Sequence, residues 1–159
     1  MKKFAFILMS LMFLAATLCS CNESFKNAAI SQEEKIDAFL EKNYKDSLVV
    51  FNQGVNRIVK FPGIEGLVAR TGDKVRFAYL AYTFDSGIGT SPFASGEYTA
   101  TIGKGEVLKG LDLGLDGMQL GEESYILFSC AYGFDKPVAG MQKVAAYAYY
   151  VKLLGINEE

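Results

Sequence analysis

The chain has 159 residues, enough for one ordinary domain, and its composition of 50% apolar and 21% charged residues is globular rather than disordered. A net charge of −2 excludes the basic surface of a nucleic-acid-binding protein. The chain lacks histidine, the commonest general base and metal ligand, and its three cysteines, Cys19, Cys21 and Cys130, form no CxxC metal motif or disulfide framework. We expect neither a metal nor a cofactor.

The N-terminus has the pattern of an export signal. Lys2 and Lys3 give it a positive start, and residues 4–18 form an apolar run broken only by Ser10 and Thr17. A membrane-spanning helix needs roughly 20 apolar residues. The shorter run is therefore more typical of the hydrophobic region of a signal peptide.

The apolar run ends in Leu18-Cys19-Ser20-Cys21, which resembles a bacterial lipobox, where a small residue precedes a cysteine that becomes lipidated and N-terminal. Cys21 fits because Ser20 is small, whereas Leu18 makes Cys19 a poor site. We therefore predict that residues 1–20 are removed and that lipidated Cys21 anchors the protein in the bacterial cell envelope, at the outer membrane. The alternative is an ordinary secretory signal cleaved nearby, without a lipid.

Residues 21–47 are expected to form a tether and an amphipathic helix. Residues 22–30 are short and polar, and Ser31 followed by Glu34 has the pattern of a capping box at a helix start. Apolar residues then recur at helical spacing, namely Ile36, Phe39 and Leu40. The helix should end near Tyr44. It either packs on the domain or forms a dimer contact, and we expect packing.

Residues 48–159 are expected to form one domain. β-Branched and aromatic residues predict strands at residues 48–51, 55–61, 74–84, 98–102, 124–130 and 145–154. One apolar helical face is formed by Val107, Leu111, Leu115 and Met118. A single helix among antiparallel strands predicts an α+β domain.

The motifs of common catalytic sites are missing from this domain. It has no GxSxG, no phosphate loop and no HExxH, and a histidine-containing triad is excluded by composition. Cys130 lies in an apolar run, so we interpret it as a small buried residue rather than a nucleophile.

A series of motifs, in order and at consistent spacing, resembles the FKBP family. Residues 102–122, IGKGEVLKGLDLGLDGMQLGE, resemble the family pattern LGxGxVIxGWxxGLxGMxxGE. Residues 131–133 match its AYG, residues 151–156 resemble its closing VELLxI, and residues 72–75 with Tyr79 resemble GxxVxVxY. The resemblance covers residues 72–156, a little over half of the chain.

This resemblance implies a twisted antiparallel sheet wrapped around one short helix, with an apolar pocket between them for the proline ring of a substrate peptide. It implies a peptidyl-prolyl cis-trans isomerase that assists folding of envelope proteins, with proline-containing segments as partners. The implied pocket residues are Tyr79, Phe93, Tyr98, Val107, Leu108, Leu111, Tyr132, Met141 and Tyr149. The Leu108 backbone N–H and the Tyr132 hydroxyl would each donate to a substrate carbonyl.

The sequence departs from the family pattern at two pocket positions. Leu111 replaces the tryptophan of the pocket floor, and the family's Phe-Asp pair falls at Phe93-Ala94, which loses the carboxylate. A second alignment, at Phe84-Asp85, keeps the aspartate but leaves the following segment too long. These departures keep open a non-catalytic peptide-binding or chaperone module as the alternative function.

Overall fold

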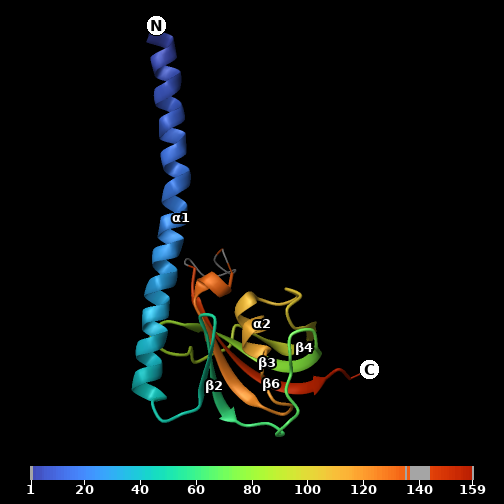
Figure 1. The fold of residues 1–159 in the computed structure, drawn as a ribbon. Helices are drawn as coiled ribbons and strands as arrows, with labels where there is room; N and C mark the ends of the chain where they lie inside the picture. Colours follow the sequence, from blue (N-terminus) through green and yellow to red (C-terminus); the bar gives the residue numbers. More distant parts are fainter. Residues whose placement is uncertain (1, 135, 137–143, 159) are drawn as a thin grey trace.

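The computed structural model describes the backbone of residues 2–134, 136 and 144–158, and the side chains of these residues from 23 onward. It contains one long helix, a six-stranded sheet and a second, short helix (Figure 1). The predicted α+β class is confirmed. Within the residues whose side chains are described, no helix is long and apolar enough to cross a membrane.

Helix α1, Lys2–Asn43, is far longer than the sequence pattern predicts, and its N-terminal half extends away from the sheet (Figure 1). The expected start at Ser31 is wrong, because that residue lies inside the helix, and residues 22–30 are helical as well. Residues 22–30 contain neither glycine nor proline, so nothing interrupts the backbone hydrogen bonds there. The predicted end near Tyr44 agrees with the observed end at Asn43.

All six strands are antiparallel, in the spatial order β1-β2-β5-β6-β3-β4. Their bounds are β1 Val49–Asn52, β2 Val55–Phe61, β3 Lys74–Phe84, β4 Ala94–Thr101, β5 Glu123–Phe128 and β6 Ala146–Ile156. The predicted strands are all present. β4 begins four residues earlier than expected, because Ala94 already pairs with Ala81 of β3.

Helix α2, Lys109–Leu115, packs on one face of the sheet, and its buried residues join the main core. It is shorter than the apolar face suggested, since Met118 lies beyond its end although it is fully buried. Gly110 allows the close approach of helix to sheet, because a Cβ atom there would lie 2.3 Å from a ring carbon of Phe128. The packing of α2 defines where a pocket can form.

The C-terminal part of α1 covers the opposite face of the sheet. Ile36 is 1% exposed and joins a second apolar cluster with Ile58, Phe84 and Leu127. Phe39 of the same helix stacks edge-on against Phe84, with 5.3 Å between ring centroids. The apolar face of α1 is thus used for packing within the chain, the role we expected for it.

The short 3-10 helix η1, Cys130–Tyr132, follows β5 and begins the connection that leads to β6. It lies close to α1, which brings the long helix near one end of the sheet. η1 starts inside the segment that the sequence assigned to a strand, so β5 ends at Phe128 rather than at Cys130.

Candidate functional site

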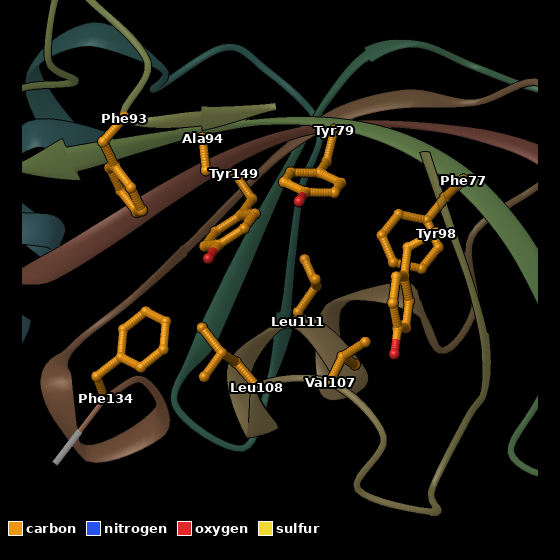
Figure 2. A pocket seen from close by; sticks show the side chains of 10 residues that line it. All are labelled: Phe77, Tyr79, Phe93, Ala94, Tyr98, Val107, Leu108, Leu111, Phe134 and Tyr149. Atoms are coloured by element: carbon orange, nitrogen blue, oxygen red, sulfur yellow. The ribbon is translucent and has the colours of Figure 1, made fainter. Parts of the chain in front are cut away.

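An apolar cavity of about 250 Å³ lies between α2 and the sheet (Figure 2). Its lining residues are Phe77, Tyr79, Phe93, Ala94, Tyr98, Val107, Leu108, Leu111, Phe134 and Tyr149. Their side chains point toward one common space (Figure 2). This cavity is the candidate site.

The sheet supplies one wall of the cavity. Phe77 and Tyr79 are two residues apart in β3 and therefore share a face of the sheet. Tyr98 of β4 lies beside Phe77, with 6.3 Å between ring centroids, and Tyr149 of β6 lies 6.0 Å from Tyr79. Neighbouring strands thus place four aromatic rings around one volume.

The segment that leads into α2 supplies the opposite wall. Val107 and Leu108 precede the helix, and Leu111 projects from its first turn with only 5% of its surface exposed. Leu108 has the extended backbone of a helix N-cap residue, with φ −55° and ψ 141°. Within the described part of the chain, no acceptor forms a hydrogen bond with its backbone N–H. That donor is therefore available to a peptide carbonyl.

The described lining of the pocket contains no Asp, Glu, Lys or Arg side chain. Among the described residues that line it, the only titratable side chains are tyrosines. Burial raises the pKa of Tyr149 to about 12, so its hydroxyl stays protonated. Ala94 occupies the position at which the family pattern has an aspartate, so this pocket also lacks the expected carboxylate. Such a site can bind, orient and exclude water, but it contains no acid–base pair.

The structure brings seven of the nine predicted residues into the lining of this cavity: Tyr79, Phe93, Tyr98, Val107, Leu108, Leu111 and Tyr149. Met141 lies outside the described residues. Two aromatic lining residues were missed, Phe77 and Phe134. From the sequence, Phe77 is only one residue of the predicted strand at residues 74–84. The one signal for Phe134 is an aromatic residue directly after the AYG motif.

Tyr132 is not among the described residues that line the cavity, although it packs against the core cluster that contains Leu111 and Tyr149. Its half-buried ring lies against the β1–β2 turn, where a Cβ atom on Gly54 would come 2.3 Å from the tyrosine hydroxyl. Lys109 Nζ lies 5.1 Å from the centroid of the same ring. Gly54 therefore leaves room for the Tyr132 ring because glycine has no Cβ atom. The Tyr132 hydroxyl is not part of the described cavity lining.

The two alignments of the Phe-Asp pair differ clearly in space. Phe93 and Ala94 line the cavity. Phe84 belongs instead to the apolar cluster beneath α1, and Asp85 forms an ion pair with Lys35 of that helix. The first alignment is therefore the one that places its residues at the site.

A buried ion pair supports the far end of the pocket helix. Arg57 of β2 donates hydrogen bonds to the carbonyl oxygens of Gly114, Asp116 and Gly117, at 2.9–3.0 Å. Its Nε atom lies 3.2 Å from Glu122 Oε1. A helix C-terminus leaves its last carbonyls without partners. Arg57 satisfies the Gly114 carbonyl of the helix and the Asp116 and Gly117 carbonyls just beyond it, and so fixes the end of α2 against the sheet.

A short helix thus packs on a twisted antiparallel sheet, and the apolar pocket between them has no Asp, Glu, Lys or Arg side chain in its described lining. The sequence belongs to a known family of this kind, since the profile described as FKBP-type peptidyl-prolyl cis-trans isomerase matches residues 66–154. This chain is a member of that family.

Individual proteins with FK506-binding or peptidyl-prolyl isomerase names are also similar to this chain in sequence. The chain is 32% identical over 116 residues to FK506-binding protein 1 of Aspergillus oryzae, covering 65% of this chain and 99% of that protein. It is 30% identical over 94 residues to FK506-binding protein 4 of Chaetomium thermophilum, covering 58% of this chain and 19% of that protein. A protein of Saccharomyces cerevisiae named peptidyl-prolyl cis-trans isomerase is 30% identical over 99 residues, 58% of this chain and 23% of its own length. The chain thus spans about a fifth to a quarter of several relatives that it matches.

Proposed function

We propose that this protein is a peptidyl-prolyl cis-trans isomerase. The observation that carries the proposal is an apolar pocket between α2 and the sheet in which tyrosines are the only titratable lining groups among the described residues. Rotation about an X–Pro bond breaks no covalent bond, so the reaction needs neither a nucleophile nor a proton donor. Uncatalysed exchange takes tens to hundreds of seconds, which leaves ample room for catalysis.

The proposed mechanism is preferential binding of the twisted amide. A planar amide carries charge separation that water stabilises, and the twisted transition state carries less. A dry, uncharged pocket lined by Tyr79, Tyr149 and Leu111 therefore favours the twisted state over the planar one. The Leu108 N–H is positioned to hold one substrate carbonyl while the bond rotates.

The test is exchange spectroscopy on a short X–Pro peptide with the full chain in mild detergent. The wild-type protein should accelerate cis–trans exchange. Val107→Arg, which introduces a charge into the cavity lining, should remove the effect, whereas Lys104→Ala on the exposed loop before it should not. Exchange at the uncatalysed rate with wild-type protein would contradict the proposal.

A second candidate function is peptide binding without useful turnover. It is favoured by the two departures at the site, Leu111 in place of the family's tryptophan and Ala94 in place of its aspartate. The same exchange experiment separates the two functions. Chemical-shift changes on peptide addition without faster exchange would support a binding or chaperone module.

We further propose that the protein acts at the bacterial cell envelope, where it assists folding of proline-containing segments of envelope proteins. The support is the sequence of residues 1–21, which has a positive start, an apolar run and a cysteine after a small residue. A multiply acylated N-terminus would be a stable anchor, because each buried methylene adds about 0.8 kcal/mol.

A further inference from the structure

The 3-10 helix η1 has no side-chain cap of its own at its N-terminus. The residue before it, Ser129, makes no side-chain hydrogen bond to the first N–H groups of the helix, and Cys130 is only 1% exposed, so water does not reach its backbone. A buried N–H group without an acceptor is costly. The acceptor comes instead from α1, because Gln32 Oε1 receives the Cys130 N–H at 2.8 Å.

The amide nitrogen of the same Gln32 side chain bonds the backbone just before β6. Gln32 Nε2 donates to the carbonyl oxygen of Val144 at 3.1 Å. The neighbouring residue of α1 adds a third contact, since Ser129 Oγ donates to Glu33 Oε1 at 2.9 Å. The Gln32 side chain thus bonds both the first residue of η1 and the residue two positions before β6.

Both bridged ends lead directly to the pocket. Phe134, a lining residue, comes two positions after the end of η1, and Tyr149, another lining residue, comes five positions after Val144. Phe134 packs edge-on against the buried ring of Tyr147 at 5.4 Å, and Phe93 packs against the same ring at 5.8 Å. The position of Phe134 in the pocket wall therefore depends on where η1 is held.

We propose that Gln32 is a positioning residue of the proline-binding pocket, through which α1, outside the family's matched region, sets the position of the Phe134 wall. The expected effects on peptide binding and isomerisation rest on the proposed function. The expected effects on the position of Phe134 and on the Cys130 amide do not. Loss of the bridge loosens the wall against which a bound peptide packs. Peptide affinity should then fall more than the exchange rate at saturating peptide, because Val107, Leu108 and Leu111 on the opposite wall remain in place.

The experiment compares Gln32→Ala, Gln32→Glu and the control Glu34→Ala, an exposed neighbour on the same helix, in the full chain in mild detergent. Gln32→Ala should weaken binding of a short X–Pro peptide by about two- to tenfold, the equivalent of one ordinary hydrogen bond. It should also shift the aromatic NMR signals of Phe134 and speed hydrogen exchange at the Cys130 amide. Glu34→Ala should leave all three unchanged.

Gln32→Glu separates the two halves of the bridge. The carboxylate still accepts from the Cys130 N–H but replaces the donor that faces the Val144 carbonyl. Protection of the Cys130 amide should therefore return, while peptide affinity stays below that of the wild type. Wild-type affinity and wild-type Phe134 signals in Gln32→Ala would overturn the proposal, as would equal losses in Glu34→Ala. If the wild-type protein neither binds nor isomerises the peptide, the proposed function fails, and the amide exchange and Phe134 signals still decide the role of Gln32.

Discussion

The guanidinium of Arg57 and the carboxylate of Glu122 form an ion pair inside the domain, with Arg57 Nε 3.2 Å from Glu122 Oε1 and their side chains 7% and 4% exposed. Burial lowers the pKa of Arg57, and the nearby carboxylate opposes that shift. Ser124 and the Gln119 N–H also donate to Glu122. The pair therefore links the end of α2 to β2 and β5 through groups that are nearly all hydrogen-bonded.

Arg57→Met should strongly destabilise the fold. It leaves Glu122 as an uncompensated buried charge and removes the donor to the carbonyls of Gly114, Asp116 and Gly117, and breaking a buried pair in this way typically costs about 3–5 kcal/mol. Chemical denaturation monitored by circular dichroism measures the loss. The matched control is Arg76→Met, whose ion pairs with Glu97 and Glu158 are exposed and should be worth at most about 1 kcal/mol.

The double variant Arg57→Met/Glu122→Met should recover much of that stability, because it removes the unpaired charge as well as its partner. If the single Arg57 variant is as stable as the Arg76 control, the buried pair is not what holds the end of α2.

Leu115→Ala should cost about 2–5 kcal/mol of unfolding free energy, the usual range for a truncation in a packed core. Leu115 is fully buried where α2 meets the sheet. Leu67→Ala serves as the control, because Leu67 is 48% exposed. A loss under about 0.5 kcal/mol for Leu115→Ala would mean that α2 does not pack as described.

Tyr149 should make stability fall at alkaline pH. Its pKa is about 12 in the folded protein, whereas an unfolded chain releases this proton near pH 10. The folded state thus binds more protons between these values, so the contribution of Tyr149 is complete below about pH 10 and is lost as the pH rises toward 12. The loss is on the order of 2 kcal/mol.

Denaturation curves at pH 8, 10 and 11 for wild type and Tyr149→Phe measure this contribution by difference, since other tyrosines titrate in both proteins. The phenylalanine variant should lose less stability as the pH rises. Parallel losses in the two proteins would show that Tyr149 does not sit in the apolar pocket.

Lipidation is predicted at Cys21. Metabolic labelling with a fatty acid should mark the wild-type protein, and Cys21→Ser should abolish the label, while Cys19→Ser should retain it because Leu18 makes that position a poor lipobox. A mature N-terminus other than residue 21, or equal labelling of the Cys21 variant, would contradict the lipoprotein prediction.

Local patterns were enough to predict the sheet and the pocket helix. Alternating residues such as Val75, Phe77 and Tyr79 identify β3 without any tertiary information, and the glycine-rich run before and within α2 carries the family motif. The same motif predicted most of the cavity lining, because Val107, Leu108 and Leu111 belong to that run.

What the sequence could not predict depends on contacts between distant segments. The pattern at Ser31 predicts a helix start, but the same residues also fit inside a longer helix. The structure has the longer helix. Tyr132 packs against Gly54, which is 78 positions away. Phe134 lines the cavity through packing against Tyr147, and the Gln32 bridge spans about 100 residues. None of these pairings has a local sequence signal.

Leu111 provides the sharpest test of the isomerase account. Tryptophan at this position in the family pattern would fill the pocket floor, and leucine leaves a looser fit to the proline ring. Leu111→Trp should therefore raise kcat/KM, by about fivefold if the closer fit to the twisted amide is worth about 1 kcal/mol. Overpacking by the larger ring should lower the free energy of unfolding by about 1–3 kcal/mol, which denaturation of the same sample measures.

The deciding measurement is protease-free exchange spectroscopy on a short X–Pro peptide with full-length wild-type protein and Leu111→Trp, each verified to be folded. The account predicts faster cis–trans exchange with the wild type than without protein, and faster exchange still with the tryptophan variant. Exchange at the uncatalysed rate with both folded proteins would contradict it.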